Sequence, residues 1–406
     1  MPRPELDIST PSRHAVRRQA KVIVMVAEAR TQRDVRLDFF RGLALWLIFI
    51  DHIPYNLISW ITIRNYGFSD AAELFVFISG YTAAFVYGRA MRESGFIVAG
   101  VRILRRVWQI YVAHIILFVF FLAEISFVTR GWENPLFAEE MGIVDFLQQP
   151  GETVMQAVLL AFKPVNMDIL PVYILLLLWF PPMLWLLLRS PTAALAASVT
   201  LYVLADRLGW NVPSYPSGYW VINPYCWQFM FVFGAWCALY GAKRMGGALR
   251  SPLALWIAAG YLAFAFAIVM TWYFPRLGVF VPRWLFSFLY PIDKTNLDVL
   301  RFAHFLALAV MVVRFVPREW RGWQWPALRP IIVCGEHSLE IFCLGIFLSF
   351  AGHFIIMEIS GSFAMQFLIS IGGLAIMSGT AWLLSWYKKL DRDPSMRQQA
   401  AGGDIA

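Results

Sequence analysis

Long runs of apolar residues, separated by short polar segments, make up most of the chain from residue 39 onward. A helix that crosses a bilayer needs about 20 mostly apolar residues. On this criterion the sequence predicts an all-α, polytopic integral membrane protein with about ten transmembrane helices. The predicted spans are residues 39–61, 71–88, 107–128, 168–188, 192–208, 225–242, 252–274, 297–316, 337–357 and 364–387.

The polar segments set the predicted domain organisation. Residues 1–36 are polar and basic and predict a cytoplasmic tail, residues 37–388 form one transmembrane domain, and residues 389–406 form a second cytoplasmic tail. Residues 152–163 are amphipathic but too short to cross, so we place them flat on the outer surface. No internal repeat is evident in the sequence.

Composition and charge agree with this architecture. Hydrophobic residues make up 59% of the chain and charged residues only 15%, against about 25% charged in soluble domains, which excludes a disordered chain or an ordinary cytosolic enzyme. The net charge of +8 is mostly topological, because 26 of the 34 Lys and Arg residues fall on the side predicted to be cytoplasmic. We therefore expect both termini in the cytoplasm, and a lipid bilayer and not nucleic acid as partner.

The first predicted span carries the densest set of polar residues, namely Asp38, Arg41, Asp51 and His52. Arg41 and His52 are eleven residues apart, so they share a helix face and stand about 16 Å apart along the axis. Pro54 predicts that the helix kinks or stops beside His52. His52 is a candidate general base, with Asp51 as its partner if the kink brings the two together; a purely structural His–Asp pair is the alternative.

Basic residues mark the start of the third predicted span. Arg102 and Arg105 lie on one helix face, and Arg106 follows directly. Guanidinium groups at a membrane surface bind phosphate in bidentate fashion, so these arginines are candidates for an anionic ligand. A topogenic cluster beside lipid headgroups explains them equally well. The four cysteines form no Cys-x-x-Cys pair and indicate no metal site.

Further candidates lie toward the outer surface. Asp298, Arg301 and His304 recur at intervals of three in the eighth span, where we expect an Asp298–Arg301 ion pair and a possible contact of Arg301 with a substrate carboxylate. The outer loop 209–228 is rich in aromatic and amide residues, including Trp220 and Asn223. Such a loop is typical of a sugar-binding surface and equally of an interfacial aromatic belt.

Four segments resemble a known family. The first span, LDFFRGLALWLIFIDH, resembles the signature of the bacterial integral-membrane acyltransferases (acyltransferase family three), in which an Arg-Gly pair precedes a catalytic histidine. AAELFVFISGYT, RILRRVWQIY and GEHSLEIFCLGI resemble three further segments of that family. Within it, RDVRLDFFRGLALWLIFIDHIPYN, GFSDAAELFVFISGYTAAFVYG and MDILPVYILLL resemble the OpgC family most closely. The Trp-x-Leu-x-x-Glu segment of many superfamily members is replaced here by Asp168-Ile-Leu-Pro.

The resemblance implies transfer of a succinyl group from cytoplasmic succinyl-CoA, a donor substrate and not a permanently bound cofactor, to hydroxyls of osmoregulated periplasmic glucans. It implies that His52 is the catalytic residue, that Arg41, Arg102 and Arg105 serve the acyl-CoA, and that the protein lies in the inner membrane of a bacterium. Direct transfer and an acyl-histidine step both remain open, as do the acyl group (acetyl is the runner-up) and the oligomeric state.

Two alternatives from other classes remain. A transporter or flippase for an anionic metabolite would use Asp51, His52, Glu73 and Arg301 as relay or binding groups, although the missing repeat argues against it. A haem-binding subunit would need paired histidines, and the sequence shows no clear facing pair among its six.

Overall fold

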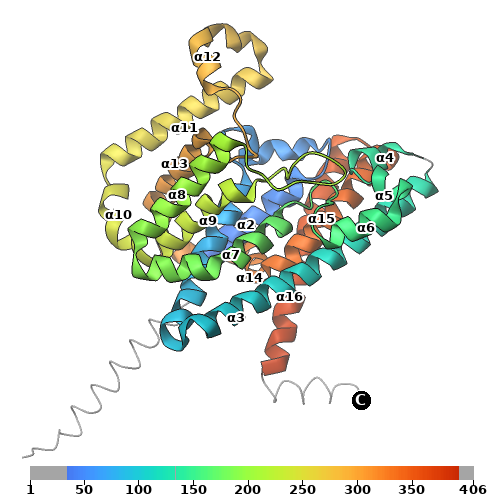
Figure 1. Ribbon diagram of the computed structural model, residues 1–406. Coiled ribbons are helices and arrows are strands. Elements are labelled where there is room, and N and C mark those ends of the chain that lie inside the picture. The colour runs from blue at the N-terminus through green and yellow to red at the C-terminus, as the bar shows by residue number, and fades with distance from the viewer. Residues whose placement is uncertain (1–33, 133, 393–406) are drawn as a thin grey trace, which may run out of the picture.

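The computed structural model describes residues 34–132 and 134–392, and within these ranges the chain is helical, with one isolated bridge between Pro213 and Tyr219 in place of any sheet. The predicted all-α class is therefore confirmed. Most of the two predicted tails, 1–36 and 389–406, lies outside the described residues. With the labels of Figure 1, the elements are α2 (Val35–Asp51), η1 (Leu57–Ile61), η2 (Ile63–Asn65), α3 (Ala71–Gly131), α4 (Leu136–Glu140), α5 (Val144–Gln148), α6 (Pro150–Val158), α7 (Ile169–Arg189), α8 (Pro191–Leu208), α9 (Pro224–Trp236), η3 (Cys237–Gly241), α10 (Ala242–Leu249), α11 (Pro252–Tyr273), η4 (Pro275–Phe280), α12 (Arg283–Leu289), α13 (Val299–Phe315), η5 (Arg321–Gln324), η6 (Pro326–Leu328), α14 (Arg329–Glu336), α15 (Ser338–Phe354), η7 (Ile355–Ile359) and α16 (Phe363–Arg392).

Several of these helices are built to cross a membrane. Five described helices are long and apolar enough to do so, which supports a membrane protein; they are Ala71–Gly131, Ile169–Arg189, Pro252–Tyr273, Ser338–Ile359 and Phe363–Asp391. The other predicted spans coincide with shorter helices, α2, α8, α9 and α13. The count of ten spans and the orientation of the termini stay predictions.

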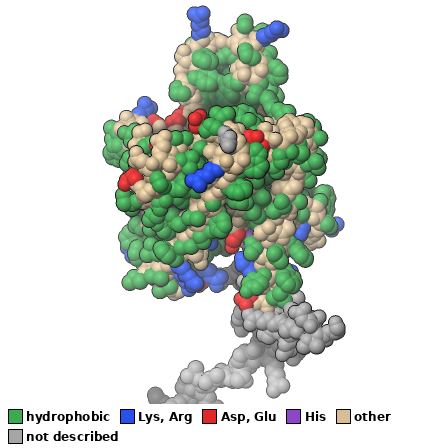
Figure 2. All heavy atoms as spheres, turned by 90° about the vertical axis from the view of Figure 1, so that its right-hand side faces the viewer, with side chains coloured by type: hydrophobic (Ala, Val, Ile, Leu, Met, Phe, Trp, Pro, Cys, Tyr) green, Lys and Arg blue, Asp and Glu red, His purple; other side chains and the backbone are tan. Residues whose placement is uncertain are grey.

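The helices form one bundle around α2 (Figure 1). Helix α2 packs against α14, α15 and α3, and α3 in turn packs against α9 and α7. We call the end of the bundle where α2 begins and α16 ends the terminal face, and the end that carries η1, η2 and α12 the loop face. Figure 2 shows a group of Lys and Arg side chains at the terminal face, a few more on the flank and at the tip of the loop face, and apolar side chains covering most of the flank.

Helix α3 corrects one prediction about the connections. Residues 89–106 were expected to be a loop between two spans, whereas the structure continues the helix through them from Ala71 to Gly131. A straight helix of 61 residues would extend about 90 Å, three times the thickness of the hydrocarbon core. The helix breaks once, at Gly95, where φ is 83° and ψ is 174°. Only glycine adopts that conformation without strain, so Gly95 divides α3 into two parts.

Helix α2 corrects the end of the first predicted span. The span was expected to reach residue 61, but the helix ends at Asp51, with His52 as its C-cap. The predicted stop beside the histidine is confirmed, because Pro54 cannot donate a backbone hydrogen bond and its ring clashes with the preceding turn. The chain then turns through Tyr55, at φ 60°, into η1 and η2. The predicted amphipathic segment 152–163 is also shorter than expected, since α6 ends at Val158.

Candidate functional site

Arg41 joins three segments that are far apart in the sequence. Its Nη2 donates to Thr82 Oγ1 of α3 at 2.6 Å, and its Nη1 donates to the carbonyl of Gly335 in α14 at 3.3 Å. Asp38, one turn earlier in α2, lies 3.6 Å from Nη1. The segments that carry Arg41, Thr82 and Gly335 are three of those on which the sequence resemblance rests.

Glycines allow these helices to meet so closely. A Cβ atom on Gly42 would overlap the carbonyl of Ile331 in α14, and one on Gly335 would overlap the carbonyl of Asp38 in α2. Gly80 of α3 meets the backbone of Phe231 in α9 in the same way. Small residues let helix backbones approach within a membrane protein, so the glycines of the three segments fix the distance at which Arg41 reaches its partners.

A pocket of about 140 Å³ opens beside Arg41. Its lining comes from α2, α3, α7 and α15 and consists of Arg41, Phe75, Ser79, Thr82, Ala83, Val86, Tyr87, Arg106, Leu170, Tyr173, Ser338, Leu339 and Phe342. Phe75 and Tyr87 are twelve residues apart on α3, which is about 18 Å along the helix axis. The pocket therefore follows the bundle axis, with its cations toward the terminal face and apolar walls toward the loop face.

The three arginines predicted at the start of the third span do not share one place. Arg106 lines the pocket with Arg41, whereas Arg102 and Arg105 are exposed and are not among the lining residues. Because Arg102 and Arg105 lie four residues and one residue before Arg106, within about one turn, all three still belong to the same stretch of α3 near the terminal face. The pocket thus has two cations in its wall and two more beside it.

His52 lies beyond the other end of the pocket, at the end of α2. Its Nδ1 is 2.6 Å from the carbonyl oxygen of Ile48. A carbonyl can only accept, so Nδ1 carries the proton, and Nε2 of the neutral ring keeps its lone pair. Asn166 Nδ2 donates to the backbone oxygen of His52 at 3.4 Å, which places the segment before α7 next to the histidine. Leu170, at the start of α7, is part of the pocket wall.

Asp51 does not form the predicted pair with His52. Its carboxylate accepts from Thr62 Oγ1 at 2.6 Å, and its backbone oxygen accepts from Arg64 at 3.2 Å. Consecutive helical side chains point about 100° apart. The end of the helix at Asp51 does not bring the two side chains into contact. Asp51 therefore holds the η1–η2 turn, while the backbone of Ile48 orients the histidine.

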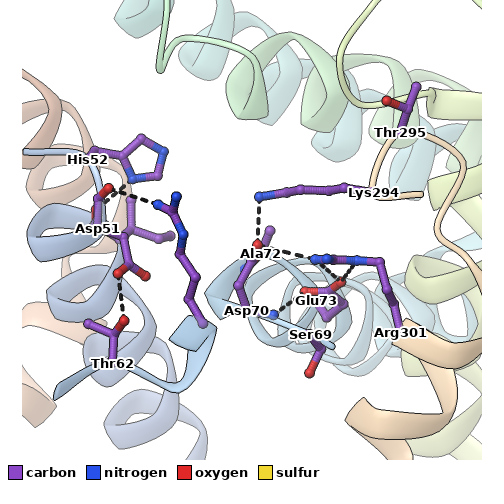
Figure 3. Close-up of polar contacts among 12 residues, drawn as sticks. Asp51, His52, Thr62, Ser69, Asp70, Ala72, Glu73, Lys294, Thr295 and Arg301 are labelled. Carbon is purple, nitrogen blue, oxygen red and sulfur yellow. Dashed lines mark hydrogen bonds and ion pairs between the residues drawn. The ribbon is translucent and has the colours of Figure 1, made fainter. Parts of the chain in front are cut away.

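A buried network of charges lies opposite His52 (Figure 3). Arg301 of α13 lies 2.6 Å from Glu73 and 3.2 Å from Asp70, and Lys294 lies 2.6 Å from Asp70. Asp70 caps α3, and the Glu73 side chain accepts from the backbone of Asp70, completing a capping box. The expected Asp298–Arg301 ion pair is wrong, because Asp298 accepts from the backbone of Leu300 as the N-cap of α13.

Three other candidates from the sequence are buried. His304 is 4% exposed and its Nδ1 is 2.7 Å from Ser69 Oγ. Asn223 is fully buried: it caps α9 and donates to Trp210 and Asn296. Trp220 is only 3% exposed, so neither Asn223 nor Trp220 lies on the exposed surface of the loop, and a sugar-binding role of the loop stays a prediction. The loop folds back over its own polar groups and exposes the rings of Trp210, Tyr219 and Tyr225.

Sequence reasoning missed residues whose roles depend on distant partners. Thr82, Tyr173 and Tyr87 became candidates only because helices α2, α3 and α7 enclose one pocket. His353 Nε2 contacts Glu140 at 2.7 Å, and Tyr55 donates to the same carboxylate; nothing in the sequence relates these three residues. The Asp70-x-x-Glu73 spacing did carry a signal, since it is the pattern of a capping box at a helix start.

The chain was compared with known proteins. The family model described as OpgC protein matches residues 33–389. Neither the curated proteins nor the solved structures contain a match. The matched range includes every residue of the pocket, His52 and the buried charge network.

Proposed function

This chain belongs to the OpgC family, and we infer its function from that membership. We propose that it is a membrane O-acyltransferase that transfers a succinyl group from succinyl-CoA to hydroxyls of osmoregulated periplasmic glucans. The terminal face would lie in the cytoplasm of a bacterium and the loop face in the periplasm. This orientation is supported by the Lys and Arg residues at the terminal face (Figure 2).

The observation that carries the proposal is the pocket with two arginines at one end and the free Nε2 of His52 beyond the other. Arg41 and Arg106 in the wall, with Arg102 and Arg105 beside it, suit the phosphates of coenzyme A. The pocket would hold the part of the pantetheine arm next to these arginines. The rest would extend toward His52, about 16 Å from Arg41 along α2, so that the thioester reaches the loop face.

The chemistry at His52 follows from its tautomer. Nε2 would accept the proton of a glucan hydroxyl as that oxygen attacks the thioester carbonyl. A carbon–oxygen bond forms, the carbon–sulfur bond breaks, and the leaving thiolate takes the proton back from the imidazolium. The Ile48 carbonyl, which accepts from Nδ1, stabilises the ring while it is charged. In the other route Nε2 attacks the thioester itself, and an acyl-histidine then reacts with the hydroxyl.

Reconstitution tests the proposal. Purified protein in proteoliposomes, supplied with labelled succinyl-CoA and periplasmic glucan, is expected to form glucan-linked succinate detectable by mass spectrometry. His52→Ala removes the base and should lower the rate at least a thousandfold while the protein keeps its thermal unfolding temperature. Trp256→Ala, which alters an exposed ring of α11 away from the pocket, is the control.

Two outcomes would contradict the proposal. His52→Ala protein with substantial activity would remove His52 from the chemistry, and wild-type protein that transfers only acetyl groups would assign a different donor. A burst of coenzyme A release without acceptor would select the acyl-histidine route over direct transfer.

A further inference from the structure

Lys163 is a partly buried cation that has no ion-pair partner among the described residues. It lies in the segment between α6 and α7, where its Nζ is 3.3 Å from the carbonyl oxygen of Leu160 and 3.5 Å from that of Ala161. No carboxylate oxygen of the described residues lies within 4.0 Å of Nζ; Asp168 acts on it only over a longer distance. Burial lowers the pKa of Lys163 to about 8 although Asp168 opposes this. A charge removed from water normally has an oppositely charged partner. The described residues provide none in contact with Lys163.

Two further polar groups on the elements packed around Lys163 have no hydrogen-bond partner in the part of the chain that the structure describes. Nζ lies over the ring of Trp220, 4.2 Å from its centre, and the indole Nε1 of Trp220 is buried with no hydrogen-bond partner. His114 of α3 is 1% exposed, and neither of its ring nitrogens has a partner. Phe118, about one turn after His114 on α3, contacts Phe162, the neighbour of Lys163, with the ring centres 6.2 Å apart. Unsatisfied buried groups are uncommon in folded proteins, and here three elements bring them to one place.

The segment that carries Lys163 is held rigidly. Ala161 accepts hydrogen bonds from the backbone of Tyr215 and from Ser214 Oγ. Tyr111 of α3 donates to the carbonyl of Val158. Further along the same segment, Asn166 contacts His52. The site is therefore preformed and fixed to the end of α2 at which we place the reaction.

The chemistry of the three groups indicates an anion. An ammonium and an indole N–H only donate, and an imidazole donates from one nitrogen in either neutral tautomer. The phosphates of coenzyme A stay near the arginines of the terminal face. The anion of the donor that reaches the loop face is then the free carboxylate at the far end of a dicarboxylic acyl group.

We propose that Lys163, with Trp220 and His114, binds the free carboxylate of the acyl group and thereby selects succinyl over uncharged acyl donors. This inference rests on the proposed function and adds the residue that determines which acyl group is used. Arg301 was the earlier candidate for this contact, but it already has Glu73 and Asp70 as partners. Lys163 has no such partner.

Binding of two donor analogues tests the site. Succinyl and butyryl analogues of acyl-CoA, made non-hydrolysable by replacing the thioester sulfur with a methylene group, have acyl chains of equal length and differ in the carboxylate. Wild-type protein should bind the succinyl analogue about ten- to a hundredfold more tightly, the range for a hydrogen-bonded charge. Lys163→Met keeps the apolar stem and should bring the two affinities within about threefold, while Lys163→Arg retains part of the preference. Arg207→Met removes an exposed cation and should change neither affinity.

Each other outcome is decisive. A Lys163→Met protein that keeps the succinyl preference, or that loses affinity for both analogues equally, would overturn the carboxylate site. In both cases the acyl transfer itself could still stand. Wild-type protein that binds neither analogue would overturn the proposed function, and the site with it.

Discussion

At the scale of single residues, the structure separates two neighbours that the sequence suggested as one unit. His52 is oriented by the backbone of its own helix through Ile48, and Asp51 binds Thr62. In a catalytic triad the carboxylate contacts the histidine directly, and its loss costs about ten-thousandfold in rate. The structure shows no such contact here, so the two residues should respond differently to substitution.

Asp51→Asn tests this difference. Asparagine keeps an oxygen that can accept from Thr62, so we expect the succinyl-transfer rate to stay within about threefold of wild type, as measured in the proteoliposome assay. Asp51→Ala leaves the Thr62 hydroxyl with one acceptor fewer and should lower the thermal unfolding temperature. A hundredfold loss of rate in a stable Asp51→Asn protein would mean that Asp51 acts on His52 during the reaction.

The charge network opposite His52 also has a structural explanation. Glu73 is fully buried, and Arg301 and Lys294 balance it and Asp70. Removing Arg301 would leave Glu73 as an uncompensated buried charge, which costs about 3–5 kcal/mol. The network therefore joins the start of α3 to α13 and stabilises the wall that faces the histidine.

At the scale of elements, glycine contacts decide where the functional side chains stand. Gly42 and Gly335 bring α2 and α14 into backbone contact, and Gly80 and Gly234 do the same for α3 and α9. Arg41 reaches Thr82 and Gly335 because these helices are so close. Separation of α2 from α14 would break the contact to Gly335 first.

Gly42→Ala should therefore destabilise the protein although alanine favours helix formation. Its Cβ would overlap the backbone of Ile331, and overpacking costs about 1–3 kcal/mol or more. We expect a thermal unfolding temperature several degrees lower in detergent, together with reduced transfer activity. Gly260→Ala in α11 is the matched control, because a Cβ there meets nothing within 4 Å, and it should be neutral or slightly stabilising. Equal stability of the two variants would contradict the packing argument.

At the scale of the whole molecule, charge and hydrophobicity are arranged along one axis. Lys and Arg residues gather at the terminal face (Figure 2), and the long apolar helices run between the two faces (Figure 1). Positive charge is retained on the cytoplasmic side of a membrane. The proposed direction of transfer, from a cytoplasmic donor to a periplasmic acceptor, depends on this orientation.

Cysteine labelling tests the orientation. In a variant whose four native cysteines are replaced, Arg283→Cys in α12 should react with a membrane-impermeant maleimide in intact spheroplasts. Arg92→Cys, in the part of α3 near Gly95, should react only after permeabilisation. Both side chains are exposed in the structure, so access to the reagent depends on the side of the membrane. The reverse pattern would invert the topology and contradict the proposed direction of transfer.

The sequence by itself determined the helical class, the approximate position of most helices and the stop beside His52. These features depend on local properties: the length of an apolar run, the sign of the flanking charge and the missing N–H of Pro54. The resemblance, carried by short segments around Arg41, Gly80 and Gly335, also identified the family that the comparison found.

Only the tertiary structure decided how the polar residues are paired. Arg41 donates hydrogen bonds to Thr82 and Gly335, which lie 41 and 294 positions further along the chain. Arg301 forms an ion pair with Glu73 and not with Asp298. It also decided that Trp220 and Asn223 are buried and that no carboxylate of the described residues contacts Lys163. Such pairings depend on which helix faces meet, and that is set by packing between distant segments, which no local pattern in the sequence records.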